Sequence, residues 1–142
     1  RLFSCILSAR GVMDFTELKE LAHLTTNRRE FSPEASGGGV GCALEAESGR
    51  VFTGINIDTA CSMGFCAEHS AVAAMVTAGE SVVKRIVAVN YKGQVLPPCG
   101  RCREFLSQIS VRNMDAEVMV APEMVVLLRD LIPYHWREFG AE

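Results

Sequence analysis

The sequence predicts a three-layer α/β/α sandwich, in which helices cover both faces of a mixed sheet of about five strands. Stretches with helical spacing of apolar residues alternate along the chain with short β-branched runs, a pattern typical of α/β folds. Two runs adjacent in the sequence can also pair as a hairpin. With 142 residues, 49% of them hydrophobic, the chain is expected to form a single domain over residues 1–142.

The N-terminal part is expected to be helical. Residues 2–9 are mildly apolar and carry no clear cleavage pattern, so we interpret them as a retained helical segment. Apolar residues recur at helical spacing over residues 15–27, and Asp14 can cap the start of that helix. An ordinary amphipathic helix is therefore predicted there.

Loops and a hairpin should follow. A proline and three consecutive glycines predict a loop over residues 31–39. The runs at 40–45 and 50–56 are separated by a Ser-Gly turn and are typical of a β-hairpin. Residues 57–65 are expected to form a second loop.

The second half alternates helices and strands. Residues 66–78 are apolar on nearly every side, which predicts a helix buried against the sheet. A strand is expected over 85–90, and a helix over 99–109 begins directly after two prolines. Another strand is expected over 116–121. Residues 125–131 are too few to divide between a strand and a helix.

Composition narrows the classes of partner. The formal net charge is -3, and the longest basic clusters are pairs, which argues against a nucleic acid polymer as a partner. No apolar stretch approaches the roughly 18–20 residues that cross a bilayer, so no membrane association is expected. Six cysteines without a convincing export signal favour metal binding or redox chemistry over disulfides, and a cytoplasmic location.

Three cysteines and one glutamate form the candidate site. Cys99 and Cys102 are spaced i to i+3 at the start of one predicted helix, and Cys66 opens another. Unpaired N–H groups at a helix N-terminus favour the thiolate, which is the form that binds zinc. Three protein ligands leave the fourth tetrahedral position of Zn²⁺ open for water, and Glu68 would stand beside that position.

Two other interpretations of these residues stay open. Cys99 and Cys102 alone could form a thioredoxin-like redox pair. A closed structural zinc site could instead recruit Cys61 or His69 as its fourth ligand. Glu68 would then be left without a role on a buried helix, which is energetically costly.

The remaining cysteines and histidines are assigned structural positions. Cys5 and Cys42 are interpreted as small core residues, because free cysteine behaves as a small hydrophobic side chain. His23 and His135 are expected on the surface.

Two motifs carry a resemblance to a known family. The Cys-Ala-Glu run at 66–68 and the Pro-Cys-Gly-Arg-Cys run at 98–102 match the signature of zinc nucleobase deaminases. From about residue 40 to 133 the chain resembles the cytidine deaminase family in its small, Cys-ligated form. The resemblance implies hydrolytic deamination of a free cytosine nucleoside, cytidine or deoxycytidine, to the uracil nucleoside and ammonia. It also implies a Zn²⁺ cofactor, with Glu68 moving protons between water, the ring and the leaving amine.

The resemblance also assigns the substrate-binding residues. Asn56 matches a Gly-x-Asn-x-Glu pattern that binds the ribose, and Asp58 is one methylene shorter than the usual Glu. Backbone groups near Ala67 and Pro98 would read the edge of the pyrimidine. Arg103 ends the matching Cys-Gly-x-Cys-Arg run and is expected in the shell of residues around the metal ligands.

The chain departs from the family at three positions. His69 stands where the family usually has an Arg that donates hydrogen bonds to the thiolates. An imidazole could donate only one such hydrogen bond, and a weaker one than Arg gives. Gly38 replaces an aromatic residue that lines the pocket, which predicts a roomier site. Glu104 replaces a common Gln.

A second resemblance keeps a larger substrate open. Blasticidin-S deaminases share these motifs, lack the Arg after Cys-Ala-Glu, and end in an aromatic tail, as this chain does with Tyr134 and Trp136. A bulkier cytosine nucleoside, such as blasticidin S or an N4-modified cytidine, is therefore the alternative substrate. Small cytidine deaminases are homotetramers that act in pyrimidine salvage, so the resemblance implies a homotetramer here.

Overall fold

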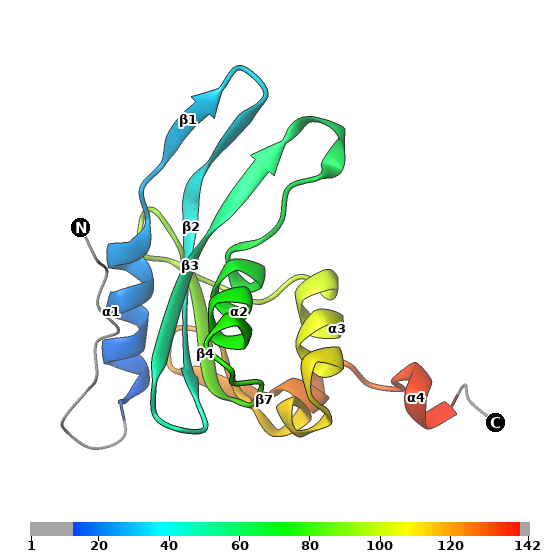
Figure 1. Ribbon diagram of the computed structural model, residues 1–142. Helices are drawn as coiled ribbons and strands as arrows, with labels where there is room; N and C mark the ends of the chain where they lie inside the picture. Colours follow the sequence, from blue (N-terminus) through cyan, green and yellow to red (C-terminus); the bar gives the residue numbers. More distant parts are fainter. Residues whose placement is uncertain (1–12, 140–142) are drawn as a thin grey trace.

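The computed structural model describes residues 13–139 as a mixed sheet with helices on both faces (Figure 1). The expected three-layer architecture is confirmed, whereas the expected number of strands was too low. Within the described residues the sheet has seven strands. They are β1 (Arg29–Ser32), β2 (Ala35–Ala46), β3 (Val51–Thr59), β4 (Val83–Asn90), β5 (Val95–Leu96), β6 (Glu117–Ala121) and β7 (Met124–Leu127).

Strand pairing explains the difference in strand number. β3, β2, β4, β6 and β7 lie side by side in that order, and β4–β6 is the parallel pair. The short β1 pairs with the first residues of β2, on the edge where β4 pairs with the rest of that strand. The short β5 pairs with the end of β4, and β6 pairs with an earlier part of β4. The main path therefore corresponds to the expected strands, and the two short strands were missed.

Helices cover the two faces of the sheet unequally. α1 (Phe15–Thr25) lies on one face, and α2 (Ala67–Thr77) and α3 (Gly100–Ile109) lie on the other (Figure 1). Side chains of β2 and β4 alternate between these faces, as in any strand. Leu44 and Ile86 pack in the cluster that contains α2 and α3 residues, while Ala43 and Val87 pack with α1.

The helix predictions are largely confirmed. Asp14 caps α1 in a capping box with Glu17, and Cys66 and Cys99 are the N-caps of α2 and α3. The region predicted as either strand or helix contains both, because β7 is followed by a 3₁₀ turn. No helix among residues 13–139 is long and apolar enough to span a membrane. The remaining helical segments are η1 (Ala60–Ser62), η2 (Val111–Asp115), η3 (Leu128–Leu131) and α4 (Trp136–Phe139).

The first predicted loop is wrong and the second is confirmed only beyond Thr59, for a shared reason. Residues 31–39 belong mostly to a β1–β2 hairpin, and β3 continues through Thr59. Ser36 pairs with Asp58, and Gly37 pairs with Ile57. The two segments expected as loops thus give each other hydrogen-bonding partners, which local composition cannot reveal. The helix expected over residues 2–9, and Cys5 within it, lie outside the described residues.

A glycine sets how closely α2 approaches the sheet. A Cβ atom at Gly54 would lie 2.4 Å from the backbone nitrogen of Ala71. The Ser70 hydroxyl donates a hydrogen bond of 2.6 Å to the carbonyl of Ile55. Because α2 rests directly on β3 here, its first turn is held at a fixed height over the sheet.

The C-terminal segment is held against α3 by Glu104. Its carboxylate accepts a hydrogen bond from Trp136 Nε1 at 2.8 Å, and its other oxygen lies 3.0 Å from His135 Nε2. Hydrogen bonds from Trp136 and Gln108 lower the pKa of Glu104 to about 2. The expectation that His135 is a surface residue was wrong: it is 4% exposed, because it lies against Glu104 and Ser107. His23 is exposed, as expected.

Replacing Glu104 by Ala should release this segment, because both acceptor oxygens are lost together. Trp136 is the single tryptophan, so its fluorescence reports on the segment directly. We expect lower emission anisotropy and faster proteolysis near the C-terminus. Glu138→Ala removes the same charge from an exposed site and should change neither. Unchanged anisotropy in Glu104→Ala would show that other contacts hold the segment.

Candidate metal centre and active site

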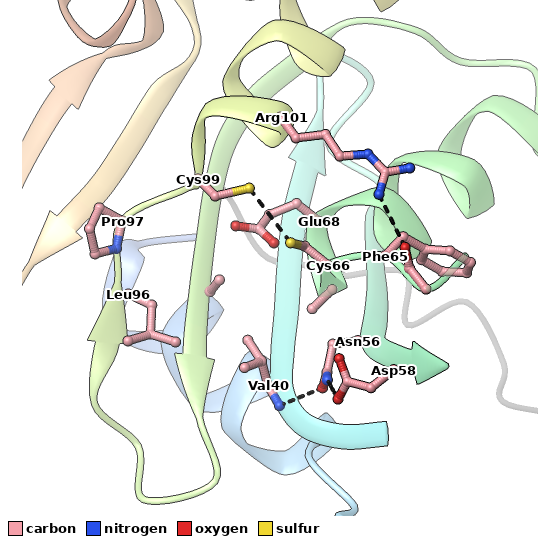
Figure 2. Close-up of a pocket in the computed structure, with 13 residues that line it drawn as sticks. Val40, Asn56, Asp58, Phe65, Cys66, Glu68, Leu96, Pro97, Cys99 and Arg101 are labelled. Atoms are coloured by element: carbon pink, nitrogen blue, oxygen red, sulfur yellow. Dashed lines mark hydrogen bonds between the residues drawn. The ribbon is translucent and has the colours of Figure 1, made fainter. Parts of the chain in front are cut away.

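Three sulfur atoms meet where two helices begin. Cys66 precedes the first residue of α2, Cys99 precedes that of α3, and Cys102 lies in the first turn of α3. The Sγ atoms of Cys66 and Cys102 each lie 3.6 Å from that of Cys99. All three atoms lie within 4.8 Å of one another. Figure 2 shows Cys66 and Cys99 facing each other at one end of a pocket.

The three thiols differ in how readily they ionise. Burial raises the pKa of Cys102, and the negative charge of Glu68 raises it further. Burial also raises the pKa of Cys66, helped by its contact with Cys99. Burial opposes ionisation of Cys99 too, but hydrogen bonds from the backbone N–H groups of Cys102 and Arg101 give it a lowered pKa. A cation at their common point is needed for all three to be thiolates together.

The donor set fits zinc. Tetrahedral Zn²⁺ with Zn–S bonds of about 2.3 Å separates its sulfur ligands by about 3.8 Å, close to the 3.6 Å contacts here. Across residues 13–139, no fourth Cys, His, Asp or Glu joins the group of three. Cys61 and His69, considered above as a fourth ligand, are therefore outside it. Three protein ligands match a site with an open position.

Glu68 lies beside the sulfur atoms. It belongs to the first turn of α2 and is 6% exposed. Burial raises the pKa of its carboxyl group, although its backbone N–H and the Cys102 thiol partly oppose the rise. Figure 2 shows the carboxylate next to Cys66 and Cys99. A buried carboxyl with a raised pKa can both accept and return a proton near neutral pH.

A cavity of about 400 Å³ opens over this group. Asn56, Asp58 and Ala67, to which the resemblance assigns substrate binding, line it together with Cys66, Cys99 and Glu68. Pro98 does not line it, and instead borders a smaller void next to Glu68. The other lining residues were not identified from motifs in the sequence, and they are Val40, Gly64, Phe65, Ala88, Leu96, Pro97 and Arg101.

The end of the cavity away from the sulfur atoms is polar. Asn56 and Asp58 are two residues apart on β3, so their side chains point to the same side of the strand. Asn56 Nδ2 donates to Asp58 Oδ2 at 2.7 Å, and its Oδ1 accepts from the Val40 backbone N–H at 2.8 Å (Figure 2). These bonds fix both side chains before any ligand binds.

Two arginines brace the start of α3. Arg103 donates to the carbonyls of Pro98 at 2.8 Å and Leu131 at 3.1 Å, so it steadies the segment leading into Cys99. Arg101 reaches across to the carbonyl of Gly64 at 3.1 Å (Figure 2). Its place between the two cysteines of one motif was a signal that the sequence analysis could have used.

Gly38 does not widen the cavity, so that expectation was wrong. It is absent from the lining, and it has a positive φ of 77°. A Cβ atom there would lie 2.1 Å from the carbonyl oxygen of Asn27. The residue is glycine because the backbone of β2 passes closely against the chain that follows α1.

The chain is similar to known deaminases in sequence and in structure. The family model described as "Cytidine and deoxycytidylate deaminase zinc-binding region" matches residues 15–117. A cytidine deaminase of Mycobacterium tuberculosis is 34% identical over 95 residues, covering 66% of this chain and 69% of that protein. The crystal structure of cytidine deaminase from Mycobacterium leprae matches with a TM-score of 0.72 and 27% identity, over 85% of this chain and 98% of that one. The Mycobacterium tuberculosis structure gives 0.73 and 29%, over 91% and 99%.

These matches define a zinc-dependent deaminase of the hydrolase class. The chain belongs to the cytidine and deoxycytidylate deaminase family, as its motifs predicted. The family match and the cluster of Cys66, Cys99 and Cys102 together identify Zn²⁺ as the cofactor that fits this site.

Gly38→Ala should lower the free energy of unfolding by at least about 2 kcal/mol, because it combines a positive φ with a backbone clash. Urea denaturation measures the change. Gly79→Ala is the matched control, since Gly79 has a φ of 89° but open space around its Cβ position. It should lose only about 1 kcal/mol. Equal losses would mean that the contact with Asn27 is unimportant.

Proposed function

We propose that this chain catalyses the hydrolytic deamination of a free cytosine nucleoside, cytidine or deoxycytidine, to the uracil nucleoside and ammonia. One observation carries the proposal. A buried carboxyl group, Glu68, lines a cavity that has two of the three converging sulfur atoms at one end and a fixed amide–carboxylate pair at the other. Such a cavity can hold a sugar at one end while a ring carbon is attacked at the other.

Each group receives a role in the reaction. Zinc held by Cys66, Cys99 and Cys102 would supply the Lewis acidity that activates water for attack on C4. Glu68 accepts one proton of that water and delivers it to N3, and it then takes the remaining hydroxyl proton from the C4 adduct and delivers it to the departing amino group. A C4–O bond forms, the C4–N bond breaks, and ammonia leaves.

The remaining residues bind and orient the substrate. Asp58 accepts hydrogen bonds from the ribose hydroxyls, since its carboxylate keeps acceptor capacity beyond its bond to Asn56, and the second N–H of Asn56 Nδ2 donates to the ribose. Ala67, on the cavity lining, reads the pyrimidine edge through its backbone. A backbone group near Pro98 is the second proposed contact for that edge, since Pro98 borders a small void next to Glu68.

A bulkier cytosine nucleoside is the second candidate substrate. The cavity volume of about 400 Å³ falls within the range of about 300–1,000 Å³ typical of sites for drug-sized ligands, which supports it. We also assign the protein to a homo-oligomer that works in cytoplasmic pyrimidine salvage, on the resemblance to small cytidine deaminases. Analytical ultracentrifugation measures the subunit number.

Glu68→Ala should retain zinc and the fold but lose turnover by about a thousandfold or more, because proton transfer to the ring and the leaving group is lost. Metal analysis and an ultraviolet assay of cytidine measure both properties. Cys102→Ala should lose zinc together with activity. Normal turnover by the Glu68 variant would remove the role given to that residue.

A panel of cytidine, deoxycytidine, N4-methylcytidine and blasticidin S should separate the two candidate substrates. We expect the unmodified nucleosides to give the highest kcat/KM. Faster turnover of blasticidin S would favour the second candidate. A zinc-loaded protein that converts no amine would support a structural zinc module, and a metal-free protein with a reducible Cys99–Cys102 bond would support a redox module.

A further inference from the structure

The imidazole of His69 is held by an aromatic stack next to the sulfur cluster. Its ring lies over that of Phe105, with centroids 4.2 Å apart and planes 12° apart. Nδ1 of the same ring lies 3.4 Å from the Sγ atom of Cys102. The Phe65 ring is farther away and tilted, at 6.5 Å and 39°. The close parallel contact is therefore the one with Phe105.

This stack joins the two helices that carry the sulfur atoms. His69 follows Cys66 by three residues on α2, and Phe105 follows Cys102 by three residues on α3. Residues three apart lie on the same side of a helix. The imidazole and the phenyl ring thus bridge α2 and α3 on the side where the sulfur atoms meet.

The orientation of the imidazole matters because a metal-bound thiolate carries no proton. Its sulfur can only accept, so the nitrogen that faces Cys102 must donate. Rotation of the imidazole about its Cβ–Cγ bond would carry Nδ1 away from that sulfur. A flat partner at 4.2 Å opposes a partial turn, because it would break the parallel contact. A half-turn would keep that contact but place Cδ2–H at the sulfur, so it would lose the hydrogen bond from Nδ1.

We propose that Phe105 is a positioning residue for the metal centre, which holds the His69 ring so that Nδ1–H donates to the Cys102 thiolate. The inference rests on the proposed role of Cys102 as a metal ligand. It adds a requirement for a flat aromatic side chain at a position away from the cavity. Phe105 is partly buried against the core and is absent from the cavity lining.

The test measures metal release rather than turnover. Zinc-loaded protein is mixed with excess chromogenic chelator, and the rate of zinc transfer is followed. Phe105→Leu should release zinc about tenfold faster, because loss of a supporting contact typically weakens metal affinity by about 10–100-fold. Phe105→Tyr keeps the flat ring and should release zinc at the wild-type rate. Phe105→Met fills the volume without a flat face, and replaces the Leu variant if that one fails to fold.

A double-mutant cycle with His69→Ala shows whether Phe105 acts through the imidazole. Once His69 is absent, Phe105→Leu should produce no further acceleration. An unchanged rate in Phe105→Leu and Phe105→Met would overturn the proposal, as would additive effects in the cycle. Cobalt-substituted protein adds a spectroscopic readout, since the sulfur-to-cobalt absorption band should shift in His69→Ala and Phe105→Leu and not in Phe105→Tyr.

Ile109→Ala is the control for loss of packing on α3. Ile109 is also partly buried against the same core, at the far end of the helix from Cys102. It should lower thermal stability without accelerating zinc release, and equal acceleration would overturn the proposal. If wild-type protein fails to bind zinc through its cysteines, the proposed function fails instead, so the two failures are distinguishable.

Discussion

The site depends on one constraint, which is that α2 and α3 begin at the same point above the sheet. α2 is fixed by its direct contact with β3 at Gly54 and by the hydrogen bond from Ser70 to Ile55. α3 is tied to the chain after β7 by Arg103, which donates to the carbonyl of Leu131 as well as to that of Pro98 just before the helix. If either helix shifted by a few ångström along the sheet, the sulfur atoms could no longer share one ion.

This convergence has an electrostatic cost that the fold alone does not offset. Burial and the charge of Glu68 raise the pKa of Cys102, and they raise that of the core residue Cys42 well above its usual value. A thiolate in this poorly solvated region, close to the Glu68 carboxylate, is therefore costly unless a cation neutralises it. Because a cation bound to the folded site offsets this cost, metal binding and folding should be thermodynamically coupled here. Burial also raises the pKa of the Glu68 carboxyl, which keeps it easy to protonate.

The chemistry could be predicted from the sequence because it is encoded locally. The spacing of Cys99 and Cys102 places both sulfur atoms on one turn, and a helix-capping position explains Cys66. The three layers, the hairpin and the long helices likewise follow from periodicity over short windows. Asp14 at the start of α1 is a capping signal of the same local kind.

The parts that could not be predicted depend on pairing between distant segments. Ser36 and Asp58 are paired in the extended sheet, yet each lies in a stretch whose composition suggests a loop. The burial of His135 depends on Glu104, 31 residues earlier in the chain. Leu96 reaches the cavity because the short strand β5 pairs with β4, and two residues give too little pattern to recognise.

The two ends of the cavity therefore have different structural origins. The sulfur end is built from helix first turns, so its reacting groups are set by short motifs and by the contact between α2 and β3. The opposite end is built from strand pairing, where Val40 of β2 holds Asn56 of β3 through a backbone hydrogen bond. Residues of β2, β3 and β5 line the cavity, whereas Gly38 lies outside the lining and allows β2 to pass close to Asn27. The size of the cavity is consequently set by the sheet, while its sulfur and carboxyl groups are set by the helices.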